Sequence, residues 1–187
     1  VLQITEDYTP TNEPATVVYA DDGGVYLGKM NEAVTTSSTD PKNNTIVMAS
    51  TIHSLESYAN LGYGGTAIRS EFILFSEFGI HPLVFFEQSS ASKKLAKKYQ
   101  QRLEYHLRFA LEKFGKVIYR FSDLSTDELL TLQYGDKYEQ TEKNPTLGNR
   151  GTFRLLNNHR SLLELEINAI NNVFKGADDL SVLAAYC

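Results

Sequence analysis

The stretch GTAIRSEFILF, residues 65–75, decides the fold, because a β-branched and apolar run that follows a glycine predicts a strand. VIYRFSD at 117–123 has the same character and predicts another strand. Between them, residues 91–114 carry apolar side chains at helical spacing, after a serine-rich start that offers an N-cap. Strand, long helix and strand form the repeating unit of a parallel sheet with crossover helices.

The same alternation continues on both sides of this unit. Further elements are predicted as a buried strand at 44–50, a helix at 52–62, a third helix at about 152–174 and a fourth strand at 180–187. A polar stretch from 123 to 151 precedes the third helix, with at most one helical turn, at TDELLTL. Loops of that length are uncommon inside compact domains unless they serve a function.

The N-terminal part of the chain has a different composition. ATVVYADDGGVYLGKM, residues 15–30, predicts two short strands around a glycine turn, which is a β-hairpin. The polar run TTSSTDPKNN at 35–44 predicts a linker. We therefore expect residues 1–43 to be distinct from the βα region at 44–187.

Composition and charge limit the function classes. The chain has 187 residues, of which 42% are hydrophobic and 22% charged, as in an ordinary globular domain. Its net charge of -5 argues against a nucleic-acid surface. No run approaches the roughly 18 apolar residues of a membrane span, and the acidic, polar N-terminus is neither a signal nor a transit peptide.

Cysteine usage adds one further limit. Cys187 is the single cysteine, so the chain has no internal disulfide and no cysteine-based zinc site. This usage favours a reducing compartment, and we expect the cytoplasm.

Three arginines are the strongest candidates for ligand binding. Arg69 and Arg120 each lie toward the end of a predicted strand, and Arg150 lies just before the third helix, with Arg154 one turn later. In parallel βα folds the carboxyl ends of the strands and the loops after them form the binding edge. Guanidinium groups converging there suit phosphate or carboxylate through bidentate hydrogen bonds.

A less specific interpretation stays open for these residues. An arginine at a strand end is more often a solvated or salt-bridged surface group than a ligand. Glu71 and Asp123 stand close to Arg69 and Arg120 in sequence and could pair with the arginines. The four histidines, at 53, 81, 106 and 159, show no metal-ligand spacing, so we expect structural or surface roles for them and no metal site.

Several phrases resemble the PEP-utilising enzyme family, and within it the phosphoenolpyruvate synthase (pyruvate, water dikinase) branch. In chain order they are ADDGGVYLGKM at 20–30, GGTAIRSEFILFSEFGIHPL at 64–83, VIYRFSDLSTDELLTLQYGDKYE at 117–139 and NPTLGNRGTFRLL at 144–156. The first resembles the tail of the family's swivelling phosphohistidine domain, and the others its PEP/pyruvate-binding barrel. The resemblance therefore implies such a tail plus linker at 1–43 and the first half of the barrel at 44–187.

The resemblance implies a fold and a set of site residues. The fold is a partial (β/α)8 TIM-type barrel of about four βα units, preceded by the hairpin and linker. PEP or pyruvate would bind at the strand ends, where arginines clamp the phosphate and the carboxylate. The residues carried over by motif are Arg69, Glu71, Arg120, Asn144, Arg150 and Arg154, with Gly148 shaping the same loop.

Two departures from the family phrases stand out, and the cofactor residues are expected elsewhere. Asp127 stands where the family usually has asparagine, and ASTIHS at 49–54 replaces an asparagine-containing phrase. The resemblance implies Mg²⁺ in the full-length parent, bound by residues on later strands, and ATP used by a domain outside this chain. It likewise places the catalytic cysteine in a late loop, so Cys187 is not that residue.

The resemblance implies a PEP synthase-like phosphotransferase that converts ATP, pyruvate and water to PEP, AMP and phosphate in its full-length form. We expect this chain alone to be inactive. Because four barrel strands leave two open edges, we expect the rest of the barrel or a second copy as partner. The alternative is a non-catalytic binding or interaction module that keeps the fold without the chemistry.

Overall fold

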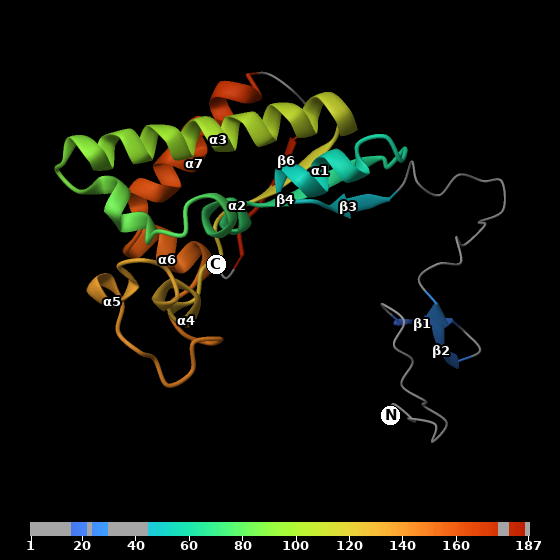
Figure 1. Ribbon diagram of the computed structural model, residues 1–187, viewed down its shortest axis with the longest axis horizontal. Helices are drawn as coiled ribbons and strands as arrows, with labels where there is room; N and C mark the ends of the chain where they lie inside the picture. Colours follow the sequence, from blue (N-terminus) through green and yellow to red (C-terminus); the bar gives the residue numbers. More distant parts are fainter. Residues whose placement is uncertain (1–15, 22–23, 30–44, 176–179, 186–187) are drawn as a thin grey trace. The chain divides into compact units, whose positions relative to one another are not determined.

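The computed structural model describes residues 16–21, 24–29, 45–175 and 180–185. The chain divides into two compact units, Val1–Asp40 and Pro41–Cys187. In the first unit, β1 (Thr16–Asp21) pairs antiparallel with β2 (Gly24–Lys29), which confirms the predicted hairpin (Figure 1). The expected linker at 35–44 and Cys187 lie outside the described residues.

The second unit contains one parallel sheet of four strands. In chain order they are β3 (Ile46–Met48), β4 (Gly65–Arg69), β5 (Val117–Arg120) and β6 (Leu180–Leu183). Their order in the sheet is the same as their order in the chain. A doubly wound sheet would reverse direction at a switch point, whereas stepwise order belongs to a barrel wall. The fold is therefore a partial (β/α)8 barrel, as predicted.

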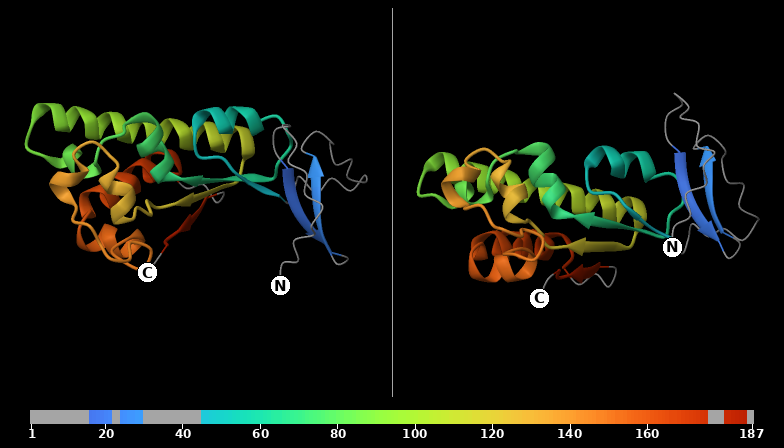
Figure 2. Two further views of the ribbon diagram at one scale, coloured as in Figure 1. Left: turned by 60° about the horizontal axis from the view of Figure 1, so that its bottom comes forward. Right: turned by 90° about the horizontal axis from the view of Figure 1, so that it is seen from below.

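Helices connect the strands and continue beyond their carboxyl ends. They are α1 (Ile52–Tyr58), α2 (Ser70–Glu77), the 3-10 helix η2 (Pro82–Phe86), α3 (Ser90–Phe114), α4 (Thr126–Leu130), α5 (Gly135–Tyr138), α6 (Gly151–Asn157) and α7 (Arg160–Val173). Figure 2, left, shows α1 and α3 above the strands, and Figure 1 shows α4, α5 and α6 gathered together. The strand arrows in Figure 2, right, point toward this group.

The long helix α3 forms the centre of the core. Ser89 caps it, with its side chain accepting from the backbone N–H of Ser92, and Gly115 ends it at a φ of 72°. The helix packs on β4, β5, α2 and α7. Tyr99 and Leu103 of α3 are fully buried, so this helix supplies much of the apolar surface that stabilises the unit.

The two faces of the sheet differ in burial. On β4 and β5, Thr66, Ile68, Val117 and Tyr119 are buried, while the residues that alternate with them are half-exposed. Arg69 and Arg120 belong to the half-exposed set. The buried set lies on the face that α3 covers, and the other face is the one that lines the interior of a barrel.

The observed strands are shorter than the predicted ones, and two of them differ in a further way. The strand expected at 65–75 ends at Arg69, and α2 follows at once. The apolar residues after Ser70 are helical because Ile73 and Leu74 bury one helix face, a pattern that a short apolar run does not distinguish from a strand. The strand expected to be buried at 44–50 is β3, in which Met48 is 62% exposed.

Two helical predictions also need correction. The helix expected at 152–174 is split into α6 and α7, because His159 turns its buried side chain inward at the junction. The polar stretch contains a second helical turn, α5, as well as the expected one at α4. Gly135 permits α5 to pack there, since a Cβ on it would lie 2.4 Å from the Leu129 carbonyl oxygen. Among the described residues, no helix is long and apolar enough to cross a membrane.

Candidate substrate-binding rim

Arg69 and Arg120 are neighbours because of strand register. They are paired residues at the carboxyl ends of β4 and β5, so their side chains project from the same face. Glu71 in the first turn of α2 links them: its Oε1 accepts from Arg69 Nε at 2.9 Å and also from Arg120 Nη2. Glu71 is 2% exposed, whereas the Arg69 and Arg120 side chains are 30% and 21% exposed.

Arg150 joins the same chain of charges through Asp123. Its Nε and Nη2 donate to the two carboxylate oxygens of Asp123 at 3.0 and 3.1 Å, a bidentate pair. Arg120 Nη1 lies 3.8 Å from Asp123 Oδ2. Arg69, Glu71, Arg120, Asp123 and Arg150 therefore form one continuous set, which we call the arginine rim. The structure thus brings three of the predicted arginines together, with the two carboxylates that the sequence offered as partners.

The arginine rim is partly open and has one hydrogen-bond donor to spare. Its guanidinium groups face Glu71 and Asp123, and each arginine side chain is partly exposed. Arg150 also interacts with the charge of Asp127. Arg120 Nε and Glu71 Oε2 are buried and have no hydrogen-bond partner among the described residues. Buried polar atoms of this kind are costly when unpaired. The arrangement is suited to an added anion that would accept from the guanidinium groups.

Arg154 lies outside the arginine rim. Its side chain is 3% exposed, and its Nη1 donates to Glu139 at 2.5 Å while Nη2 donates to Thr126. Its Nε donates to the carbonyl oxygen of Asn149 at 2.6 Å, which fixes the backbone directly before Arg150. Arg154 therefore supports the loop that presents Arg150.

The other two loop residues singled out by motif lie on the segment before Arg150. Asn144 is exposed, and its carbonyl oxygen accepts from the backbone N–H of Leu147 at 3.2 Å, closing a turn. Gly148 lies under the Glu142 side chain, whose Oε2 would be 1.7 Å from an added Cβ, so a side chain there would require the flexible Glu142 side chain to move.

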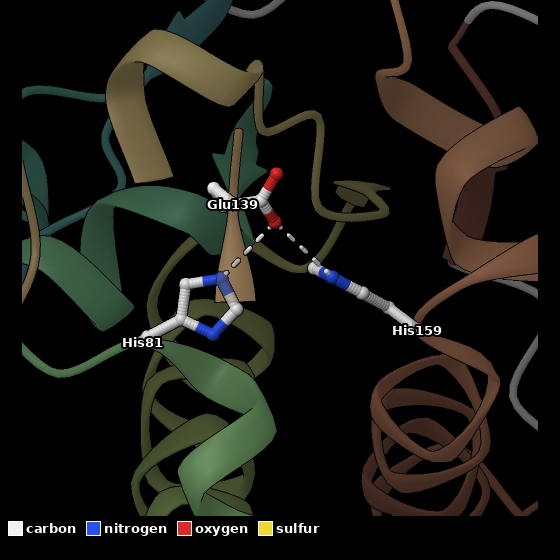
Figure 3. A group of neighbouring side chains, drawn as sticks. All are labelled: His81, Glu139 and His159. Atoms are coloured by element: carbon white, nitrogen blue, oxygen red, sulfur yellow. Dashed lines mark hydrogen bonds and ion pairs between the residues drawn. The ribbon is translucent and has the colours of Figure 1, made fainter. Parts of the chain in front are cut away.

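The sequence analysis missed a second cluster, formed by His81, Glu139 and His159 (Figure 3). Glu139 Oε1 lies 3.2 Å from His81 Nε2 and 3.7 Å from His159 Nε2. Tyr138 stacks on the His81 ring with centroids 4.8 Å apart. Together with Arg154 these residues form what we call the buried brace: His81, Glu139, Arg154 and His159. The expected structural role of these histidines agrees with this burial.

The pKa values in the buried brace follow from burial and the nearby charge. Burial and, to a smaller extent, the charge of Arg154 together lower the pKa of His159 to about 4. Burial alone would raise the pKa of Glu139, but hydrogen bonds from His81 and Arg154 outweigh it and the pKa is lowered. At neutral pH the brace therefore holds an ionised Glu139 and a neutral His159.

Two histidines and a glutamate could in principle bind a metal ion, but their hydrogen bonds do not fit one. His81 Nδ1 accepts from the backbone N–H of Leu83 at 3.3 Å, so the neutral ring carries its proton on Nε2. That nitrogen then has no lone pair for a cation. Arg154 also occupies Glu139 Oε1, which would place a guanidinium beside any metal. The hydrogen bonds of this cluster thus already use atoms that a cation would need.

The arginine rim does not fit a magnesium ion either. Mg²⁺ prefers carboxylate and water oxygens in octahedral geometry. Both rim carboxylates, Glu71 and Asp123, already accept hydrogen bonds from guanidinium groups. A divalent cation placed there would face the positive charge of the arginines.

The two departures from the family phrases have local roles. Thr51 caps α1 in a reciprocal capping box with Ser54, which accounts for the ASTIHS sequence. Asp127 lies in the first turn of α4, where a negative charge interacts favourably with the helix dipole. A hydrogen bond from Ser125 lowers the pKa of Asp127.

Several known proteins are similar to this chain in sequence. The probable phosphoenolpyruvate synthase of Staphylothermus marinus is 33% identical over 127 residues, covering 64% of this chain and 14% of that protein. The phosphoenolpyruvate synthase of Neisseria meningitidis serogroup B is 30% identical over 176 residues, covering 82% and 22%. The one from Synechocystis is 26% identical over 193 residues, covering 89% and 24%.

The chain thus spans less than a quarter of the length of these relatives. Residues 28–184 match the family described as PEP-utilising enzyme, PEP-binding domain. That range contains the whole arginine rim, the buried brace and the parallel sheet. The chain therefore belongs to the PEP-utilising enzymes and carries the PEP-binding domain of phosphoenolpyruvate synthase-like members.

Proposed function

We propose that the arginine rim binds PEP or pyruvate in a phosphoenolpyruvate synthase-like phosphotransferase. The observation that carries the proposal is the strand register that sets Arg69 beside Arg120, with Arg150 joined through Asp123. Planar guanidinium groups grip phosphoryl and carboxylate oxygens by paired hydrogen bonds. Such a grip orients the substrate and stabilises charge on the phosphoryl group as it is transferred.

Within this proposal the rim residues have distinct roles. Arg69 and Arg120 contact the phosphoryl oxygens, and Glu71 holds the two guanidinium planes in place. Arg150, Arg154 and Asn144 belong to the loop side of the site, where Arg154 fixes the backbone that presents Arg150. The full-length parent would convert ATP, pyruvate and water to PEP, AMP and phosphate. The rim carboxylates are paired with arginines, which disfavours them as magnesium ligands, and we propose that residues of the parent other than these hold magnesium and ATP.

A titration tests the binding proposal. PEP is titrated calorimetrically into the chain and into the variant Arg120→Ala, with Arg160→Ala as control, since Arg160 is 79% exposed on α7. We expect millimolar or tighter binding by the chain and by the control. Loss of a charge-assisted pair at Arg120 should cost about 2 kcal/mol, which is roughly thirtyfold in affinity.

The second candidate is a non-catalytic module, and one observation favours it. Every rim arginine is already paired with Glu71 or Asp123, so the rim is stable without a ligand. If neither the chain nor the variant binds PEP, this candidate is favoured. We expect no PEP formation from pyruvate and ATP by the chain alone in either case, and measurable turnover would contradict that.

We also infer that the exposed strands at the sheet edges are covered by further βα units of the parent. Met48 of β3 is 62% exposed, and Val182 and Leu183 of β6 are 49% and 48% exposed. Unpaired apolar strand edges associate readily. We expect the chain alone to bind a hydrophobic dye or to self-associate on size-exclusion chromatography. A monomer that binds no dye would contradict the inference, and a defined dimer would identify a second copy as partner.

A further inference from the structure

Glu166 is a fully buried carboxyl behind the arginine rim. It projects from α7, is 0% exposed, and accepts three hydrogen bonds. Tyr119 Oη and the backbone N–H of Ser122 donate to its Oε2 at 3.1 and 3.2 Å, and Ser122 Oγ donates to its Oε1. Neither the rim nor the buried brace uses this group, and a buried carboxyl without a cationic partner is costly when ionised.

Hydrogen bonds lead from Glu166 to the backbone of the arginine rim. Ser122 Oγ lies 2.9 Å from Ser70 Oγ, and the single hydroxyl proton of Ser70 is shared between Ser122 Oγ and the carbonyl oxygen of Arg120, 3.2 Å away. Ser70 directly follows Arg69, so one short chain joins Glu166 to the ends of both β4 and β5. The position of the rim arginines therefore depends on how Glu166 holds Ser122.

Few titratable groups face Glu166 in the part of the chain that is described. They are Tyr119 from β5, Tyr99 from α3 and Glu71 from α2. Burial raises the pKa of both tyrosines well above its usual value, so they stay neutral. Burial, as the main cause, and the negative charge of Glu71, as a smaller one, raise the pKa of Glu166 to about 7 against the hydrogen bonds that lower it. The pKa of Glu166 therefore depends on the negative charge at the arginine rim.

We propose that Glu166 is a positioning residue of the arginine rim that takes up a proton from solvent when a doubly charged anion binds Arg69 and Arg120. The inference rests on the proposed function, since it requires that an anion binds there. The bound anion adds negative charge on the same side as Glu71, which disfavours the carboxylate form of Glu166. The solvent proton forms an O–H bond on the Glu166 carboxyl, which then donates within the same hydrogen-bonded chain.

The direction in which pH changes the anion affinity follows from the change in the pKa of Glu166. Anion binding raises the pKa of Glu166, so the complex holds more protons than the free chain. Affinity is therefore greater at low pH and falls as pH rises through about 7. Each unit of pKa change on binding corresponds to about a tenfold difference in affinity between the low-pH and high-pH limits.

Sulfate is the probe, because it carries two charges throughout this range and does not titrate itself. It is titrated calorimetrically into the chain, into Glu166→Gln and into Glu164→Gln at about pH 5.5 and about pH 8.5. Glu164 is the matched control, since it lies on the same helix and is 61% exposed. We expect several-fold tighter binding at low pH for the chain and for the control, and equal affinities at both pH values for Glu166→Gln.

A second readout uses the unmodified chain. Sulfate binding near pH 7 is measured in buffers of different ionisation enthalpy, and we expect net proton uptake, which decides the question even if Glu166→Gln does not fold. Sulfate binding without proton uptake, or with the same pH dependence in Glu166→Gln, overturns the inference and leaves the anion site standing. Absence of sulfate binding at both pH values overturns the proposed function together with the inference.

Discussion

The arginine rim and the buried brace use the same residue types in neighbouring segments, and they differ in exposure. The rim arginines are 18% to 30% exposed, whereas Arg154 in the brace is 3% exposed. In the brace, Arg154 donates to Glu139, Thr126 and the Asn149 carbonyl. In the rim, Arg120 Nε has no partner among the described residues. An arginine with satisfied, buried donors stabilises the fold, while one with spare donors at a strand end is available to a ligand.

The largest expected effect comes from breaking the brace. Arg154→Ala leaves Glu139 as a buried carboxylate without its guanidinium partner, and such losses cost about 3–5 kcal/mol. We expect chemical denaturation to show a loss of that order in the free energy of unfolding. Arg160→Ala, on the exposed face of α7, is the control and should change it by less than about 0.5 kcal/mol. Equal stability of the two variants would contradict the role of the brace.

A pH titration of stability probes the brace in another way. The pKa of His159 is lowered to about 4 in the folded chain, below the usual histidine value of about 6.5, so the folded state binds fewer protons. Stability from this group is complete above about pH 6.5 and is lost as pH falls toward 4, by about 3 kcal/mol in total.

Glu166 changes the free energy of unfolding with pH in the opposite direction to His159. Its pKa is raised to about 7, so stability falls as pH rises from the unfolded value of about 4.5 toward 7. In the unmodified chain the contributions of His159 and Glu166 to the pH dependence of stability therefore oppose each other. We expect the midpoint of thermal unfolding to fall less in acid for His159→Gln than for the unmodified chain. An unchanged pH profile in this variant would contradict the assigned protonation.

A smaller effect is expected where the rim is altered conservatively. Arg150→Lys keeps the charge but loses the bidentate pair with Asp123. We expect PEP affinity to fall about tenfold, which is about 1.4 kcal/mol, with little change in the unfolding midpoint. Arg154→Lys is the matched variant in the brace, and we expect it to lower stability more than affinity. If both variants behave alike, the distinction between the two regions fails.

The smallest effect is expected on the exposed loop. Asn144 lies in a turn whose carbonyl is already used by Leu147, and its side chain is exposed. Asn144→Ala should weaken PEP binding by a few-fold at most, because a solvated amide contributes about 1 kcal/mol or less. PEP affinity is measured calorimetrically for Asn144→Ala and Arg150→Lys together. A larger loss of affinity in Asn144→Ala than in Arg150→Lys would contradict this prediction.

The sequence predicted the rim because its geometry follows from chain order. Arg69 and Arg120 end consecutive strands of a parallel sheet, so strand order alone sets them side by side. The brace could not be predicted in the same way. His81 and Glu139 are 58 residues apart, and their contact depends on how α5, α6 and η2 pack. The segments GIHP and KYE contain these residues, but their spacing in the sequence does not predict that they are in contact.

Two local errors have related physical causes. The apolar residues after Ser70 fit a strand as well as a buried helix, and packing against α3 decides for the helix. No proline or glycine lies at the break between α6 and α7 at His159. Two weak helix formers, Asn157 and the C-cap Asn158, precede it, and the His159 ring is buried beside Glu139 at the junction.

In the proposed site the rim arginines bind the ligand and Arg154 does not. The direct test is to follow the arginine Nε–Hε signals by NMR while PEP is added to the chain, with assignments from single Arg→Lys variants. We expect saturable shifts at Arg69, Arg120 and Arg150, while Arg154 stays unchanged because its side chain is 3% exposed and its donors are occupied. Shifts confined to Arg154, or no shift at any of the four, would contradict the proposed site.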